Sequence, residues 1–226
     1  NFEKFKQHVE KAMRMMDDII DLELEKVELI INKIAADPED EDIRRVELEL
    51  WKKIRTMARK GRRTGLGITA EGDMLAALGL RYGTPEATAF AVKVQKTLAL
   101  EAYRASVKMA AERGAFEIFD ARKEEKNPMI GRIREADPEL YAEMVKHGRR
   151  NIAMLTIAPT GTTSLMSQTT SGIEPVFRPV YKRRRKINPS DQDAKVAFVD
   201  DMGEKFEEYN VYHHNFVKWL EANGYD

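Results

Sequence analysis

Residues 151–175 join a short apolar run to a turn rich in glycine and hydroxyl side chains. The run itself, residues 152–157, is short and continuous, and it predicts a strand buried on both faces. The segment from Ala158 to Ser164 then contains one proline, one glycine and three threonines, and it predicts a loop that opens a short helix. The chain must therefore fit a strand, a turn and a helix start in direct succession.

The predicted helix start has the properties of a phosphate-binding site. Backbone N–H groups at a helix N-terminus lack intrahelical partners, and the helix dipole adds partial positive charge there. Gly161 allows the backbone to approach an anion closely, and Thr160, Thr162 and Thr163 can add hydroxyl donors. The Gly-Lys-Ser/Thr ending of a Walker A loop is absent, so no lysine is placed at a terminal phosphate. The alternative is an ordinary strand-to-helix connection with conventional caps.

Two amphipathic helices are predicted in the N-terminal quarter. Apolar residues recur at three- and four-residue spacing over residues 2–34, and Pro38 with its acidic neighbours ends this pattern. A second helical pattern covers residues 43–57 and stops near Gly61.

Two further helices follow. Thr69 is a plausible N-cap for a helix that runs to Leu78. A cap, a proline and an acid at residues 84–86 begin a longer helix that the apolar series sustains to Gly114. At 1.5 Å per residue this helix is about 40 Å long, enough to flank a barrel.

The remaining segments are shorter. Asn127 and Pro128 predict a loop, and residues 137–148 predict a helix opened by Asp-Pro-Glu and closed by glycine. Residues 176–187 look extended, residues 188–193 form a polar turn, and a short helix is expected over residues 215–222. Long helices alternating with few strands favour an α/β fold.

Composition limits the classes of function. The chain has 38 basic and 38 acidic residues and no net charge, which gives no argument for a nucleic-acid partner. No apolar run approaches the ~18 residues of a membrane helix, and no signal peptide is visible. We expect a cytoplasmic protein with no membrane partner.

Three other clusters receive structural interpretations. The basic run 182–186 is typical of a solvated strand end, with polyphosphate or nucleic-acid binding as the alternative. His213 and His214 point to opposite faces if they lie in a strand, and no third ligand is nearby, so no metal site is predicted. Residues 65–67 lack the strand and third glycine of a dinucleotide fingerprint and indicate tight packing at a helix start.

Three motifs, in the same order, resemble the large subunit of ribonucleotide reductase, above all its adenosylcobalamin-dependent class II branch. The family has ALLTIAPTGTIS followed by SSGIEP where this chain has residues 153–164 and 171–175. It has RKIGLGVMGLADLLAKLGIRY where this chain has residues 62–82, and a third match covers residues 112–120. The resemblance extends over roughly residues 10–187.

The resemblance implies a fold that local patterns do not give. The family fold is a ten-stranded α/β barrel built from two parallel five-stranded halves. Residues 1–226 would then be a helix-rich fragment of this catalytic barrel domain. Residues 24–59 would be a helical-hairpin insertion, and residues 188–226 a C-terminal extension.

The resemblance also implies a function and a site. The family converts ribonucleotides to deoxyribonucleotides by radical chemistry, with adenosylcobalamin as the class II cofactor. The substrate phosphates would be held by the turn, with Ser164 as an extra donor: Pro159, Thr160, Gly161, Thr162, Thr163 and Ser164. The class II pattern has isoleucine at Thr163, and Glu174 is a candidate for contact on the substrate side.

The chain contains no cysteine, which excludes disulfides and thiolate metal sites. The family depends on a cysteine thiyl radical and a reducing cysteine pair, so we expect a piece of a longer enzyme, inactive alone and without catalytic residues of its own. Its partners would be the ribonucleotide, the remaining part of the same polypeptide and, at full length, a second copy in a homodimer. The alternatives are an inactive relative, a non-enzymatic phosphate- or nucleotide-binding helical module, and a folding unit that binds nothing.

Overall fold

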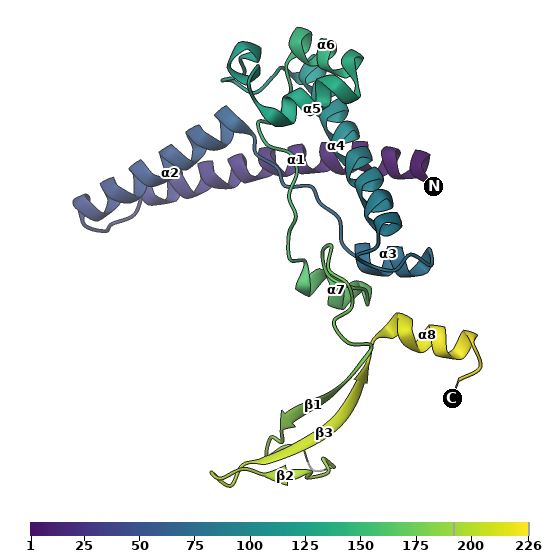
Figure 1. Cartoon of the computed structure of the whole chain (residues 1–226). Coiled ribbons are helices and arrows are strands. Elements are labelled where there is room, and N and C mark those ends of the chain that lie inside the picture. The colour runs from purple at the N-terminus through teal and green to yellow at the C-terminus, as the bar shows by residue number, and fades with distance from the viewer. Residues whose placement is uncertain (192, 226) are drawn as a thin grey trace. The chain divides into compact units, whose positions relative to one another are not determined.

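The computed structural model describes residues 1–191 and 193–225, most of which are helical (Figure 1). The chain divides into two compact units. The first contains residues 1–67 and 89–156, and the second contains residues 68–88 and the chain from residue 157 onward.

Helices α1 (Phe2–Ala35) and α2 (Glu41–Gly61) form a hairpin in the first unit (Figure 1). The side chains of Asn1 and Asp40 cap their N-termini, as these residue types do at helix starts. Both predicted helices are confirmed. Residues 24–59, predicted as an insertion, form the outer part of this hairpin, and their status as an insertion stays a prediction.

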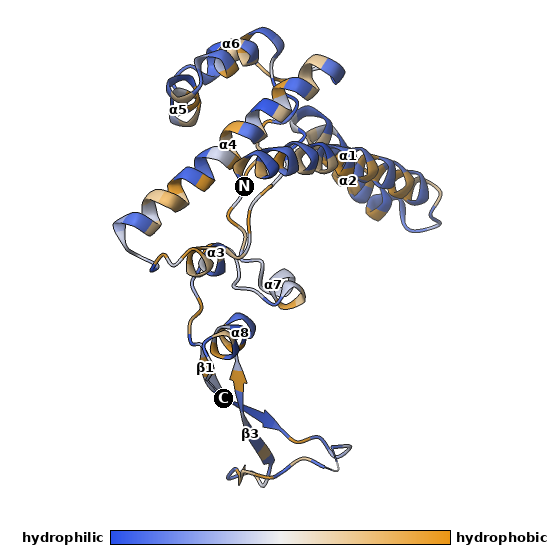
Figure 2. Ribbon diagram, turned by 90° about the vertical axis from the view of Figure 1, so that its right-hand side faces the viewer, coloured by the Kyte–Doolittle hydropathy of each residue, from blue (hydrophilic) through white to orange (hydrophobic). Residues whose placement is uncertain are grey.

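The hairpin buries one face of α1 and leaves other apolar positions exposed. Val27, Ile31 and Ile34 are buried. Orange positions recur along both helices in Figure 2. The exposed apolar residues of the hairpin are Met15, Ile19, Leu22, Leu29, Ile43, Val46, Leu50 and Met57. Among the described residues, no helix has the length and apolar character needed to cross a membrane.

Helix α4 (Pro85–Arg113) confirms the long helix expected after residue 84, and most of it belongs to the first unit. Its buried residues recur at helical spacing and include Val94, Leu98, Ala102, Ala105 and Met109. This face supplies much of the core of the first unit.

Two short helices, α5 (Pro128–Ala136) and α6 (Pro138–His147), pack together after the 3-10 turn η1 (Ala121–Glu124). The expectation of a loop at Asn127 and Pro128 is wrong. Asn127 Oδ1 accepts a hydrogen bond from the Met129 N–H (3.0 Å), so this pair caps and begins α5.

The second unit contains α3 (Glu71–Ala77), α7 (Gly161–Ser167) and α8 (His214–Ala222). It also contains an antiparallel sheet of β1 (Val180–Lys186), β2 (Phe198–Val199) and β3 (Lys205–Tyr212) in the order β1-β3-β2. Val180 pairs with Tyr212 and Lys186 with Phe206. The extended stretch and the C-terminal helix are confirmed, whereas β3 was not predicted.

The buried strand predicted over residues 152–157 is wrong. The segment makes one isolated parallel bridge, between Leu155 and Leu66. Leu66 N–H donates to Met154 O (2.8 Å), and Thr156 N–H donates to Leu66 O (3.0 Å). Met154 is buried whereas Thr156 and Ile157 are exposed, so the segment is not covered on both faces along its length.

The tight packing expected at residues 65–67 is real, but it does not lie at a helix start. A Cβ atom on Gly67 would lie 2.5 Å from Thr156 O, so only glycine fits this approach. Helix α3 begins later, after Ala70, which has φ 64° and makes no side-chain cap. The N-cap predicted at Thr69 is therefore wrong, because its hydroxyl bonds elsewhere.

Candidate functional site

Helix α7 begins at Gly161, as the sequence predicts. Thr160 is its N-cap residue, with φ 48° and ψ 26°. The first intrahelical hydrogen bond runs from Ser164 N–H to Thr160 O (2.9 Å). The N–H groups of residues 161–163 therefore precede the helical hydrogen-bond ladder and have no acceptor within it.

The turn is open on the side of Gly161. A Cβ atom built on Gly161 would have no atom within 4 Å, so space lies directly beside its backbone. Thr162 and Thr163 are exposed, and neither hydroxyl bonds to another described residue. Three amides and two hydroxyls are thus accessible to a ligand at one short segment.

The hydroxyl of Thr160 has a different role from those of its neighbours. It accepts a hydrogen bond from Gly172 N–H (2.6 Å) and lies 3.0 Å from Thr69 Oγ1. Either of these two hydroxyls can donate to the other, and Thr69 Oγ1 also lies 3.3 Å from Thr170 O, to which it can donate. The Thr160 side chain is therefore bonded within the second unit and fixes the turn.

Ser164, Pro159 and Glu174, the remaining residues of the predicted site, differ in what they can offer a ligand. Ser164 is buried and its hydroxyl donates to Gly161 O (2.8 Å), so this hydroxyl is bonded within the turn. Pro159 is exposed but has no N–H, and it can only shape the turn. Glu174 is exposed, and its carboxylate lies over Gly172, where a Cβ would be 2.7 Å from Oε2.

The segment after α7 is bound to the first turn of α3, and the two helices lie side by side in Figures 1 and 2. Ala70 N–H donates to Thr170 O (3.1 Å), and Glu71 N–H donates to Gly172 O (3.2 Å). Asp73 and Thr170 exchange two further bonds: Asp73 N–H to Thr170 Oγ1 (3.1 Å) and Thr170 N–H to Asp73 Oδ2 (3.0 Å). Sequence patterns gave no sign of this long-range cap.

Strained backbone gathers in this part of the second unit. Ala70, Thr160 and Gln168 all have positive φ values, of 64°, 48° and 56°. Such conformations cost about 1–3 kcal/mol when the residue is not glycine, and they persist where surrounding contacts hold them. Thr160 and Gln168 are the residues that flank α7, so both ends of this helix have left-handed backbone.

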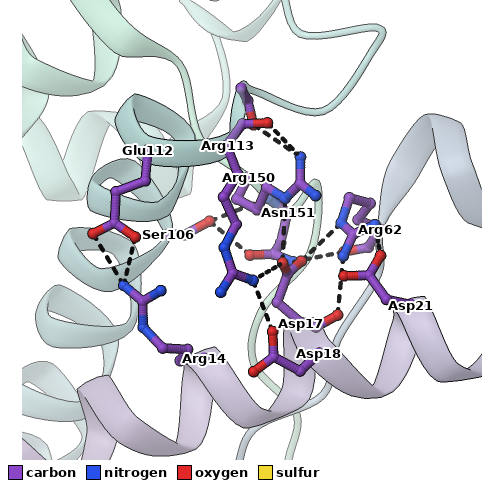
Figure 3. A network of polar contacts seen from close by, with 11 residues as sticks. Arg14, Asp17, Asp18, Asp21, Arg62, Ser106, Glu112, Arg113, Arg150 and Asn151 are labelled. Carbon is purple, nitrogen blue, oxygen red and sulfur yellow. Dashed lines mark hydrogen bonds and ion pairs between the residues drawn. The ribbon is translucent and has the colours of Figure 1, made fainter.

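The first unit contains a buried charge cluster around Asp17, which sequence reasoning missed (Figure 3). Asp17 is fully buried and accepts hydrogen bonds from Arg62 Nε (2.8 Å), Asn151 Nδ2 (2.9 Å) and Arg150 Nε (3.2 Å). Burial alone would raise the pKa of Asp17, but the hydrogen bonds and the charge of Arg62 outweigh it and lower that pKa. The cluster holds Asn151, the first residue of the segment 151–175 that contains the predicted phosphate-binding turn.

Acidic oxygens of Asp17, Asp18 and Asp21 lie within 4.8 Å of one another, a spacing that suits a metal ion. Guanidinium groups already pair with them: Arg113 with Asp18 (2.7 Å) and Arg62 with Asp21 (2.8 Å). The cluster is therefore neutralised by protein cations and gives no reason to assign a metal.

The basic run 182–186 lies on exposed strand β1, opposite acidic residues of β3. Arg184 pairs with Glu208 and Arg185 with Glu207, each at 2.6 Å. This pairing supports the structural interpretation of the run. His213 and His214 lie at the start of α8, so the assumption that they occupy a strand is wrong.

A family model described as "Ribonucleotide reductase, barrel domain" matches residues 1–215. The chain therefore belongs to the ribonucleotide reductase family, and its match is to the barrel domain of that family; the matched residues are mostly helical. The resemblance drawn from the three motifs is confirmed.

Two of its relatives are named vitamin B12-dependent enzymes. The chain is 36% identical over 127 residues to the vitamin B12-dependent ribonucleoside-diphosphate reductase of Mycobacterium tuberculosis (strain CDC 1551 / Oshkosh), covering 56% of this chain and 16% of that protein. It is 31% identical over 224 residues to the enzyme of the same name from Thermoplasma acidophilum, covering 99% of this chain and 23% of that protein. The chain thus spans less than a quarter of the length of these relatives.

Proposed function

We propose that the chain is part of a B12-dependent ribonucleoside-diphosphate reductase and that the turn of residues 159–164 holds the phosphates of the ribonucleoside diphosphate through the amides of residues 161–163 and the hydroxyls of Thr162 and Thr163. Membership of the family and the names of the relatives support the reaction and the diphosphate substrate. The main observation in favour of this phosphate-binding site is the open turn at Gly161, with its accessible amides and hydroxyls.

In this proposal the turn contributes binding and orientation. The amides of residues 161–163 donate to phosphate oxygens, and the hydroxyls of Thr162 and Thr163 add to them, while Pro159, Thr160 and Ser164 shape the turn. The dipole contributes a few tenths to ~2 kcal/mol. Fixing the phosphates orients the ribose, and positioning of this kind can lower a barrier by several kcal/mol. Glu174 would lie on the substrate side.

Adenosylcobalamin supplies the initiating radical in the proposed whole enzyme. The sequence has no cysteine, so the thiol that would carry this radical and the reducing pair are not residues of this chain. The chain therefore does not fit the cofactor by itself, and no radical step is assigned to it. We propose that the remaining polypeptide supplies these groups in the cytoplasm and completes a ten-stranded barrel in a homodimer. Residues 24–59 and 188–226 are then an insertion and an extension.

The first experiment tests phosphate binding with the 226-residue chain. Titration of ADP should shift the amide NMR signals of residues 161–163. Gly161→Ala adds one methyl group in open space and should weaken ADP binding about tenfold by blocking the anion, without unfolding the chain. Gly131→Ala is the matched control, since it also adds a methyl group in a helix with no atom within 4 Å. Unchanged signals in the unmodified chain would refute the site.

The second experiment tests the reaction. The full-length product of the gene should convert CDP to dCDP with adenosylcobalamin and a dithiol, and Gly161→Ala should raise KM more than it lowers kcat. A gene product without cysteine, or one that binds ADP but forms no dCDP, would instead favour the non-enzymatic nucleotide-binding module.

A further inference from the structure

We propose that Asp73 is a positioning residue for the phosphate-binding turn, acting through Thr170 and Gly172 on Thr160. This inference rests on the proposed function. Asp73 lies in the first turn of α3, and it is not among the residues expected to touch the nucleotide.

The Asp73 carboxylate joins three segments of the second unit. Its Oδ2 atom accepts hydrogen bonds from Thr170 N–H (3.0 Å) and Asn215 Nδ2 (2.8 Å). Its side chain is 14% exposed, so water competes little for these bonds. Hydrogen bonds to an ionised carboxylate are roughly twice as strong as neutral ones. Asp73 thus ties α3 to the segment after α7 and to the start of α8.

The effect of Asp73 reaches the turn in two steps. Thr170 is held at its N–H, its hydroxyl and its carbonyl oxygen, by Asp73 and Ala70. Two residues later, Gly172 N–H donates to the Thr160 hydroxyl (2.6 Å). Because Thr160 is the N-cap residue of α7, the position of residues 170–172 sets the direction of the amides that follow it.

His213 lies next to the second oxygen of the Asp73 carboxylate. Its Nε2 atom is the buried side-chain nitrogen or oxygen without a hydrogen-bond partner among the described residues, and it lies 3.7 Å from Asp73 Oδ1. The two carboxylate oxygens therefore have different tasks: Oδ2 makes the bonds that fix the turn, and Oδ1 faces the imidazole.

A merely structural role for Asp73 makes a different prediction. An acid in the first turn of a helix is stabilised by the dipole, whatever else it contacts. In that case only the charge matters, and asparagine would be as harmful as alanine. In the positioning role, asparagine keeps an oxygen acceptor for Thr170 N–H and should preserve the turn.

The experiment compares Asp73→Ala, Asp73→Asn and the control Asp201→Ala in the 226-residue chain. Asp201 is an exposed acid in the same unit, so its removal matches the change in net charge. ADP affinity, the ³¹P chemical shift of ADP at saturation and hydrogen exchange at the Thr170 amide are measured. We expect Asp73→Ala to weaken ADP binding about tenfold, to move the bound ³¹P shift and to speed exchange at Thr170. Asp73→Asn should restore most of each property, and Asp201→Ala should change none.

Two outcomes overturn the inference and leave the proposed function intact. In the first, Asp73→Ala binds ADP with unchanged affinity and ³¹P shift although the Thr170 amide exchanges faster. In the second, Asp73→Asn folds but binds ADP as weakly as Asp73→Ala does. Absence of ADP binding by the unmodified chain would refute the proposed function instead. If Asp73→Ala does not fold, Asn215→Ala replaces it, since it removes the second donor to Asp73 Oδ2 (2.8 Å), loosens the carboxylate and should weaken ADP binding with the same change in ³¹P shift.

Discussion

At the scale of single residues, Asp17 is the fully buried carboxylate at the centre of the charge cluster in the first unit. A fully buried carboxylate is costly unless it is paired and hydrogen-bonded, and Asp17 meets both conditions. Removing it leaves Arg62, which is 6% exposed, with Asp21 as its one remaining acidic partner among the described residues.

Asp17→Ala should lower the free energy of unfolding by about 3 kcal/mol, near the lower end of the usual range because Asp21 still pairs with Arg62. Urea unfolding measures this change. Asp18→Ala is the control: Asp18 is half exposed, and its pair with Arg113 should contribute less than about 1 kcal/mol. Equal losses in the two variants would contradict the role of the buried cluster.

The lowered pKa of Asp17 predicts a pH dependence with a defined sign. As the pH falls, the unfolded chain takes up a proton near the ordinary value of 3.8, whereas the folded chain resists until lower pH. The stabilisation by Asp17 is therefore present above about pH 4 and is lost below it. Urea unfolding between pH 7 and pH 3 measures this loss, and Asp17→Asn should decline less steeply than the unmodified chain.

At the scale of elements, α3 and the segment 170–175 approach so closely that Gly72 cannot carry a side chain. A Cβ atom there would lie 2.5 Å from Glu174 O and 2.8 Å from Pro175 Cα, both backbone atoms that cannot turn aside. The contact holds the helix against the segment that follows α7.

Gly72→Ala should therefore destabilise the second unit by about 1–3 kcal/mol, as overpacking does. Gly161→Ala adds the same methyl group in open space and should change stability by less than about 1 kcal/mol, in either direction. Thermal unfolding of both variants, followed by the signals of α3, gives the comparison. A melting temperature that falls equally in both would show that the close approach is not maintained.

Elements defined by local signals could be predicted from the sequence, and those defined by distant partners could not. The cap and proline at residues 137–138 correctly predict the start of α6. The same signal at Asn127 and Pro128 begins α5, although a loop is predicted there. The hydrogen bonding of residues 152–157 depends on a neighbouring segment about 90 residues away, which no local pattern encodes. The helix start at Gly161 was predicted, but the use of the Thr160 hydroxyl by Thr69 and Gly172 was not.

At the scale of the whole molecule, opposite charges cancel almost completely. The chain has 38 basic and 38 acidic residues and an isoelectric point near 7.1. Periodicity could not reveal a barrel domain, because closure of a barrel depends on strands that pair across long distances; the order of three motifs revealed the family instead.

Solubility of the chain should be lowest near pH 7 and should rise toward pH 9, because net charge opposes association. Light scattering of concentrated samples across this pH range measures the effect. Scattering that is weakest near pH 7 would contradict it and would indicate that exposed apolar side chains, rather than net charge, control association.

The left-handed backbone of Thr160 has one more consequence. Glycine adopts φ 48° without strain, whereas a β-branched residue adopts it only where contacts with its neighbours stabilise this conformation. In Thr160→Gly the loss of strain should offset the loss of the hydrogen bond, so the melting temperature should stay nearly the same. The variant should nevertheless bind ADP more weakly, because Gly172 N–H loses its acceptor, the Thr160 hydroxyl. Threonine at this position is thus explained by the orientation of the Gly172 N–H and of the amides of α7, and not by thermal stability.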